Sequence, residues 1–127
     1  MRPSVMIVDD EAPIRKALVD FLEDYDEFRL RAAASGEEAL ESLRAEPADL
    51  CVVDMRLPGM RGEEFIVAAA EGGLCRRFVL HTGSVGPVLG EALSDLGLTE
   101  ADVFRKPCDS TAILERARVL LSRTAEE

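Results

Sequence analysis

The side chain best suited to chemistry in this chain is the carboxylate of Asp54. It follows the apolar run 50–53 and precedes the turn-forming pair Pro58 and Gly59. An apolar run that is closed by such a turn predicts a strand buried on both faces, as in a parallel sheet. Asp54 would then lie at the carboxyl edge of the sheet, where open α/β sheets bind their ligands. A carboxylate placed there can attack a phosphoryl group and form an acyl phosphate.

Three consecutive acids follow the first apolar run, residues 4–8, and these are Asp9, Asp10 and Glu11. Neighbouring carboxylates repel one another, and packing alone would not gather them at a strand end. A divalent cation would relieve the repulsion, because carboxylate oxygens are its preferred ligands. The alternative role is to favour the start of the next helix, whose dipole places positive charge at the first turn. The run of acids by itself is compatible with both roles.

Two later apolar runs are also followed by polar groups. Thr82 follows residues 78–81, and Lys106 follows residues 103–105. Together with the acids, these side chains come from four strand ends that would meet at one edge of a parallel sheet, and their convergence indicates a site. His81 is the only histidine of the chain. We expect it to be a strand residue rather than a catalyst, since no acid partner for it is evident.

Hydrophobic periodicity predicts strands that alternate with helices along the whole chain. The expected strands are residues 4–8, 28–34, 50–53, 78–81 and 103–105. The expected helices are residues 12–25, a segment between Ser35 and Pro47, residues 63–71, residues 85–96 and a segment after Asp109. This alternation predicts an α/β fold with a parallel sheet and helices on both faces. Residues 85–96 should form the least stable helix, because Gly86, Pro87 and Gly90 lower its helix propensity.

The chain has 127 residues, a formal net charge of -10 and a pI of about 4.6. This length fits one domain that folds alone. The negative charge argues against direct binding of nucleic acid or anionic lipid, which both require clustered basic residues. With no apolar run of about 18 residues and no basic leader, we expect no membrane span and a cytoplasmic location. Cys51, Cys75 and Cys108 lack CxxC spacing, so we expect buried small residues rather than disulfides or zinc ligands.

Taken together, the polar segments at the strand ends resemble the receiver domain of two-component response regulators, of the chemotaxis-regulator type, over essentially the whole chain. The residues that carry the resemblance are Val8, Asp9, Asp10 and Glu11 after the first strand, Asp54, Met55, Arg56, Leu57, Pro58 and Gly59 after the third, Thr82 and Gly83 after the fourth, and Lys106 and Pro107 after the fifth. The resemblance implies a single receiver domain over residues 1–127. It also implies a flavodoxin-like, doubly wound five-stranded parallel sheet of order 2-1-3-4-5 with helices on both faces.

The same resemblance implies a role for the acids at the sheet edge. Asp54 would be the phosphoacceptor. Mg²⁺, with Mn²⁺ as the alternative ion, would be held by Asp9, Asp10, Asp54 and the backbone carbonyl of Arg56. Three aspartates, one divalent cation and the ammonium of Lys106 would make the loaded site neutral.

By the resemblance, Thr82 and Lys106 would contact the phosphoryl group through a hydroxyl and an ammonium. Arg56 and Ser84 lie where the family tunes how fast the acyl phosphate hydrolyses. The peptide bond between Lys106 and Pro107 is usually cis in the family, and we expect the same here.

The chain departs from the family pattern near its fourth and fifth strands. The family often has an aromatic residue three positions before the lysine, whose ring turns inward as the threonine moves; this chain has Val103 there, followed by Phe104. A signal toward the fourth and fifth helices must therefore use other packing, or Phe104 must act from the opposite strand face. Gly83 replaces a common alanine, which should leave the acceptor carboxylate accessible. The interval between the threonine and the lysine is slightly long, which predicts an insertion near residues 97–101.

The resemblance also implies which classes of protein are partners and which reactions the chain catalyses. The phosphoryl donor would be a sensor histidine kinase or a histidine phosphotransfer protein, and the target an output domain or partner protein. Phosphorylation should move the turn after the fourth strand and repack residues 85–96. A homodimer would use the face of the fourth helix, fifth strand and fifth helix. Catalysis would comprise the chain's own Mg²⁺-dependent phosphorylation and dephosphorylation rather than metabolism.

Two other interpretations belong to different functional classes. A pseudo-receiver would keep the fold and act by protein contact alone; the complete set of chemical residues argues against it, whereas Val103 keeps it open. An enzyme of the same topology fits poorly. A dinucleotide-binding enzyme would need glycines after the first strand, and an aspartate-based phosphatase would normally have a second acid where Arg56 stands.

Overall fold

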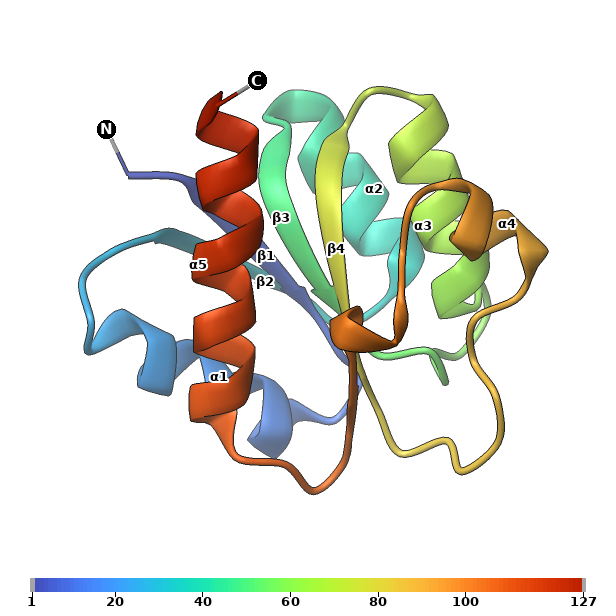
Figure 1. Ribbon diagram of the computed structural model, residues 1–127, viewed down its shortest axis with the longest axis horizontal. Coiled ribbons are helices and arrows are strands. Elements are labelled where there is room, and N and C mark those ends of the chain that lie inside the picture. Colours follow the sequence, from blue (N-terminus) through green and yellow to red (C-terminus); the bar gives the residue numbers. More distant parts are fainter. Residues whose placement is uncertain (1, 127) are drawn as a thin grey trace.

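Five parallel strands form one sheet in the order β2-β1-β3-β4-β5 (Figure 1). The computed structural model describes the backbone of residues 2–126 and the side chains of residues 2–123. The strands are β1 (Ser4–Val8), β2 (Arg29–Ala33), β3 (Ala48–Val53), β4 (Cys75–Thr82) and β5 (Val103–Arg105). The helices are α1 (Ala12–Glu23), α2 (Gly36–Ala45), α3 (Gly62–Glu71), α4 (Glu91–Asp95) and α5 (Ser110–Glu126), with a short 3-10 helix η1 (Glu100–Asp102). The predicted flavodoxin-like α/β fold is confirmed.

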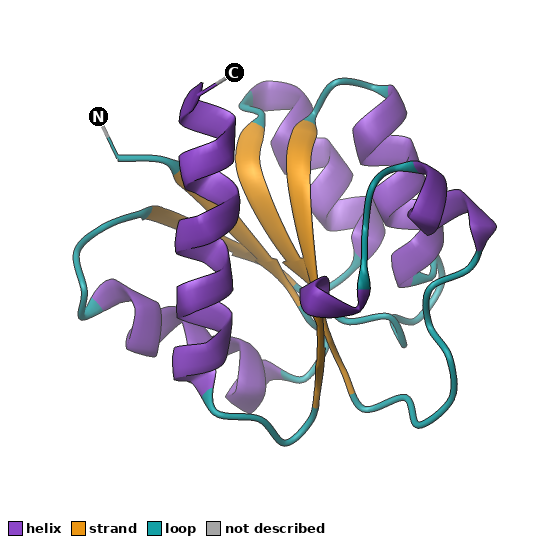
Figure 2. Ribbon diagram, in the orientation of Figure 1, coloured by secondary structure: helices purple, strands orange, loops and turns teal. Residues whose placement is uncertain are grey.

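Helices cover both faces of the sheet, and each face has its own hydrophobic core (Figure 2). α1 and α5 pack on one face, where they bury Ile7, Val52 and Val79 of the central strands. α2, α3 and α4 pack on the other face and bury Val53 and Leu80. The neighbouring β3 residues Val52 and Val53 are 2% and 0% exposed, as expected for a strand that is covered on both sides.

The register of β1 and β3 brings two acids together at the carboxyl edge. Val8 pairs with Val53, so the next residues, Asp9 and Asp54, leave the sheet beside one another. The amide of Asp54 donates to the carbonyl of Val8 over 2.9 Å. The backbone therefore positions both carboxylates before any side-chain contact forms.

The ends of β4 and β5 are aligned in the same way. Thr82 pairs with Arg105, and the amide of Lys106 donates to the carbonyl of Thr82 over 2.8 Å. Side chains of β5 alternate between the two cores: Val103 packs on the side of α4, and Phe104 packs on the side of α1 and α5. Phe104 therefore faces away from the segment that leads from β4 to α4.

Helix α4 is shorter than the sequence predicts. A helix was expected over residues 85–96, but α4 spans only Glu91–Asp95, and residues 83–90 form neither helix nor strand. Glycine and proline at positions 86, 87 and 90 explain the difference, because they weaken a helix that has little packing to compensate. Leu93, which is fully buried, fixes the remaining turn to the core.

Other element boundaries differ by a few residues. β4 begins at Cys75 rather than at Phe78, and α1 ends at Glu23 rather than at Tyr25. The predicted insertion near residues 97–101 falls on a turn that leads into η1. Gly97 adopts a positive φ of 95° in this turn, a conformation that favours glycine.

Cys51 and Cys75 are buried, and Cys108 is half-buried. Burial raises the pKa of the Cys51 thiol, so the sulfur remains a protonated, apolar core group at neutral pH. Within the described residues, no helix has the length and apolar character needed to cross a bilayer.

Candidate functional site

Four carboxylates gather at the carboxyl edge of β1 and β3, and they belong to Asp9, Asp10, Glu11 and Asp54. Each offers an oxygen atom, and these atoms lie within 4.8 Å of one another. Asp9 and Asp54 are 3% and 4% exposed, whereas the other two residues face solvent. Glu11 belongs to this cluster, as the run of three acids suggests, although the family resemblance does not include it among the metal ligands. Hard divalent cations prefer such oxygen ligands, so the chemistry of the cluster fits a metal.

The ammonium of Lys106 joins three of these carboxylates. Its Nζ atom donates to Asp9 Oδ2 over 2.8 Å, to Asp54 Oδ2 over 3.1 Å and to Glu11 Oε1 over 3.1 Å. Burial alone would lower the pKa of Lys106, but the three hydrogen bonds outweigh it and raise that pKa, so the ammonium stays charged. One ammonium bonds three of the four clustered carboxylates, and the excess of negative charge favours a bound cation.

Backbone amides orient the two buried carboxylates. Asp9 Oδ1 accepts a hydrogen bond from the amide of Glu11 over 2.9 Å, and Asp54 Oδ1 accepts one from the amide of Arg56 over 3.0 Å. In each aspartate, one carboxylate oxygen is thereby held by the backbone amide two residues later in the chain, as in an Asx-turn. The other oxygen of each carboxylate is left to meet Lys106 and the shared space between the strands.

Two glycines shape the loop that follows Asp54. Gly59 has a positive φ of 70°, and a Cβ atom there would meet Glu37 Oε2 at 2.7 Å. A Cβ atom on Gly62 would lie 2.7 Å from both the carbonyl oxygen of Asp54 and Met55 Cα. Because the latter contacts are backbone atoms that cannot turn away, glycine is required for the loop to pack against the site.

The Thr82 hydroxyl is fully buried at the end of β4 and is engaged with Ser84. Thr82 Oγ1 donates to Ser84 Oγ over 3.2 Å and accepts from the amide of Ser84 over 3.2 Å. The hydrogen bonds of the Asp54 side chain go to Lys106 and to the amide of Arg56 within the described chain. Thr82 thus lies at the predicted edge, but its hydroxyl is turned to its own loop.

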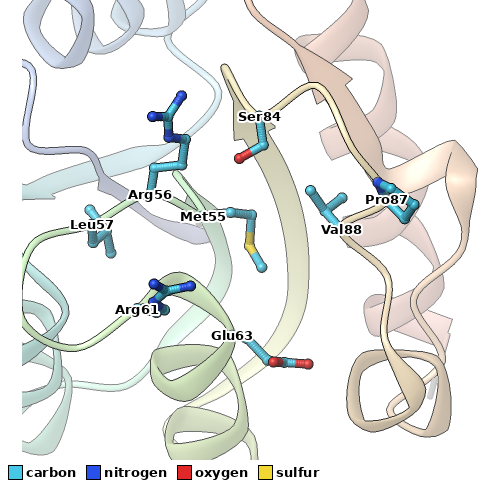
Figure 3. A pocket seen from close by; sticks show the side chains of 8 residues that line it. All are labelled: Met55, Arg56, Leu57, Arg61, Glu63, Ser84, Pro87 and Val88. Carbon is cyan, nitrogen blue, oxygen red and sulfur yellow. The ribbon is translucent and has the colours of Figure 1, made fainter.

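A cavity of about 460 Å³ lies between the loop after β3 and the loop after β4 (Figure 3). It is lined by Met55, Arg56, Leu57, Arg61, Glu63, Ser84, Pro87 and Val88. Figure 3 shows Ser84 and Val88 across the cavity from Arg56 and Leu57. Arg56 also lines a smaller cavity, of about 210 Å³, with Asp10, Glu11, Asp54 and Gly83. Arg56 therefore lies between the two cavities and borders the acid cluster, whereas Ser84 lines only the larger cavity.

His81 lies inside β4 and is 9% exposed, as a strand residue would be. Burial, assisted by the positive charge of Lys106, lowers its pKa, so the imidazole is neutral at pH 7. On this side of the sheet, an apolar groove of about 600 Å³ runs between α1 and residues 106–110. The peptide bond between Lys106 and Pro107 is cis.

Comparison with known proteins identifies the family. Residues 5–118 match the model of the response regulator receiver domain. The transcriptional regulatory protein AfsQ1 of Streptomyces coelicolor is 33% identical over 132 residues, which cover 98% of this chain and 54% of that protein. The transcriptional regulatory protein YvrH of Bacillus subtilis is 31% identical over 121 residues, which cover 95% of this chain and 50% of that protein. The chain spans about half the length of these curated relatives.

Solved structures show the same fold. A CheY-like response regulator receiver domain protein from Methanospirillum hungatei superposes with a TM-score of 0.78 at 24% identity, and all of both chains is covered. The acid cluster is compatible with the acidic pocket in which receiver domains bind a divalent metal. The strand order, the match over residues 5–118 and the curated relatives lead to one conclusion. The chain belongs to the family of response regulator receiver domains of two-component signalling.

Proposed function

We propose that Asp54 accepts a phosphoryl group in a Mg²⁺-dependent reaction and that the resulting acyl phosphate switches the conformation of this domain. The observation that carries the proposal is the position of Lys106, whose ammonium lies 3.1 Å from Asp54 Oδ2 and 2.8 Å from Asp9 Oδ2. A cation at this place can stabilise the phosphoryl oxygens as they approach a negatively charged carboxylate.

The proposed reaction is a direct transfer between two nucleophiles. A carboxylate oxygen of Asp54 forms the new bond to phosphorus, and the bond from phosphorus to the donor nitrogen breaks, so that the donor imidazole keeps the electron pair and takes up a proton. Lys106 then shares its charge with the phosphoryl oxygens. The Thr82 hydroxyl can donate one hydrogen bond to them once it releases Ser84.

The metal ligands of this proposal are Asp9, Asp10, Asp54 and the backbone carbonyl of Arg56, with Mg²⁺ as the ion and Mn²⁺ as the alternative. Glu11 lies in the same cluster and can replace or assist one of these ligands. When bound, the ion would neutralise carboxylate and phosphoryl charge. The position of Asp10 supports this assignment. Its carboxylate lies in the cluster, and Lys106 donates to the other three carboxylates but not to this one, so a metal ion would supply the positive charge beside it.

The partners of this proposal follow from the family. The donor is a sensor histidine kinase or a histidine phosphotransfer protein in the cytoplasm, and residues 1–127 act as one receiver domain on an output domain or partner protein. Direct binding of nucleic acid by this domain is disfavoured by its net charge of -10. Homodimers would use the face of α4, β5 and α5. Relatives are transcriptional regulators by name, so the output that this domain controls would be transcription.

The test is mass spectrometry of the protein after incubation with acetyl phosphate and Mg²⁺. We expect a gain of about 80 Da, the mass of one phosphoryl group, that disappears with EDTA and in Asp54→Asn. Asp20→Asn, which alters an exposed aspartate of α1, is the matched control and should gain the same mass. A folded wild-type chain that never gains this mass would support the pseudo-receiver instead.

A further inference from the structure

Residues 83–90 form the segment between β4 and α4 (Figure 1). Val88 and Leu89 pack against the core, but the first half of the segment, residues 83–86, is loosely attached to the rest of the domain. Within the described part of the chain, residues 83–89 make no backbone-to-backbone hydrogen bond. Val85 is 98% exposed, and a Cβ atom added to Gly83 or Gly86 would meet no other atom within 4 Å. Packing therefore contributes little to holding the first half of this segment in place.

One side chain of β5 connects this segment to the sheet. The Nη1 atom of Arg105 donates to the carbonyl of Ser84 over 2.6 Å and to the carbonyl of Gly86 over 2.8 Å. Arg105 ends β5 directly opposite Thr82, so its backbone is fixed by the ladder while its side chain crosses to the loop. A guanidinium suits this task, because the two N–H groups of its one terminal nitrogen are held in a rigid plane and can each meet a carbonyl.

The residue that Arg105 holds is also the residue that engages the Thr82 hydroxyl. Ser84 donates its amide to Thr82 Oγ1 and accepts the hydroxyl proton on its own Oγ, both over 3.2 Å. A hydroxyl has one proton to donate. Thr82 can therefore bond a phosphoryl oxygen at Asp54 only after it gives up Ser84 Oγ.

We propose that Arg105 is a positioning residue, which holds Ser84 against the Thr82 hydroxyl and so opposes the turn of that hydroxyl toward a phosphoryl group. The inference rests on the proposed function of Asp54. Arg105 is also the β5 side chain that reaches the segment after β4, since Val103 has no ring and Phe104 packs on the α1 and α5 side. Arg105 thus links the loop to the edge strand of the sheet.

Removal of this link should favour the phosphoryl-bound arrangement. We expect Arg105→Gln to bind beryllofluoride, a phosphoryl mimic, about three- to tenfold more tightly than the wild type in the presence of Mg²⁺, because two charge-assisted hydrogen bonds no longer favour the free state. Arg105→Lys should give an intermediate affinity, since an ammonium keeps the charge but not the planar fork. NMR titration that follows the backbone amide of Thr82 measures these affinities.

Arg29→Gln is the matched control, because Arg29 is an exposed arginine on the opposite edge strand, where it pairs with Glu46. It should bind beryllofluoride like the wild type. Equal or weaker binding by Arg105→Gln, with the control unchanged, would overturn the inference. If the wild type itself binds no beryllofluoride, the proposed function fails and this role of Arg105 fails with it.

The tether itself is tested without any mimic. Amide hydrogen exchange at Ser84, whose amide donates to Thr82 Oγ1, should be faster in unmodified Arg105→Gln than in the wild type, and unchanged in Arg29→Gln. Equal exchange in all three proteins would show that Arg105 does not restrain the loop. That result would overturn the inference even in a chain whose Asp54 is phosphorylated normally.

Discussion

Lys106 Nζ lies 3.1 Å from Asp54 Oδ2, although 52 residues separate them in the chain. The contact depends on two features of the sheet. β3 and β4 are neighbours, and so are β4 and β5, so all three end at the same edge. The lysine then spans the width of β4 to reach the carboxylates, and this single side chain connects β5 to the acids of β1 and β3.

Replacement of this lysine should uncouple the acids from β5. We expect Lys106→Met to lower the free energy of unfolding by about 1–3 kcal/mol, because Asp9 and Asp54 would lose their buried cationic partner. The affinity for Mg²⁺ should rise, since the cluster becomes more negative. Urea unfolding and a Mg²⁺ titration measure the two effects. Lys16→Met, which removes an exposed lysine of α1, is the control, and equal stability of both variants would contradict the prediction.

Removal of the exposed acid Asp10 should have opposite effects on stability without and with Mg²⁺, because it lowers charge repulsion but also removes a metal ligand. Without metal, Asp10→Asn should raise the thermal midpoint by about 1–4 °C, because one repelling charge leaves the cluster. Added Mg²⁺ should raise the midpoint of the wild type more than that of the variant, since binding to the native state stabilises it by mass action. Calorimetry with and without Mg²⁺ measures both changes. An identical Mg²⁺ effect in the two proteins would exclude Asp10 as a ligand.

The close approach of Gly62 to the site should make this position intolerant of any side chain. We expect Gly62→Ala to lower the free energy of unfolding by about 2–4 kcal/mol, because its Cβ atom would press on the backbone of Asp54 and Met55. Gly86→Ala, at a glycine with open space around it, should change the stability little. Chemical denaturation of both variants makes the comparison. If both variants lose a similar amount of unfolding free energy, the close contact at Gly62 is not the cause of the loss.

The pKa of His81 predicts a dependence of stability on pH. Burial and the nearby Lys106 cation lower this pKa below its ordinary value of 6.5, so the unfolded chain takes up a proton more readily than the native protein. The resulting stability is fully present above pH 6.5 and is lost as the pH falls through the lowered pKa. We therefore expect the metal-free protein to become less stable as the pH falls below about 6.5, and His81→Gln to lose less stability over the same range. Urea unfolding of both proteins at several pH values measures this. If the free energy of unfolding depends on pH in the same way in the wild type and in His81→Gln, the prediction is wrong.

Phosphoryl binding should change the dynamics of the segment from Gly83 to Leu96. Beryllofluoride with Mg²⁺ should alter its amide hydrogen exchange, because Thr82 must leave Ser84 to reach the mimic. Thr82→Val keeps the shape of the side chain but has no hydroxyl, so most of this change should disappear. Unaltered exchange in the wild type would contradict a switch at this turn. Protection of α1, on the opposite face, serves as the internal reference.

Much of the fold could be predicted from hydrophobic periodicity. The run 50–53 is apolar at consecutive positions because β3 is covered on both faces, and Ser35 opens α2 by accepting a hydrogen bond from the amide of Glu38 over 3.1 Å. The prediction of a long fourth helix was wrong, since propensity at positions 86, 87 and 90 outweighs the apolar spacing there. Boundaries set by weak local preferences are the ones that shifted.

The sequence by itself determined which chemical groups stand at the sheet edge, because burial of alternating strands and helices forces the polar residues that follow each strand to one rim. Only the tertiary structure decided how those groups pair. Three contacts correspond to no periodic pattern in the sequence. They are the sharing of Lys106 by three carboxylates, the hydrogen bond of the Thr82 hydroxyl to Ser84 and the hydrogen bond of Arg105 to the loop. Such contacts depend on loop paths and side-chain rotamers, which are settled when distant segments pack together.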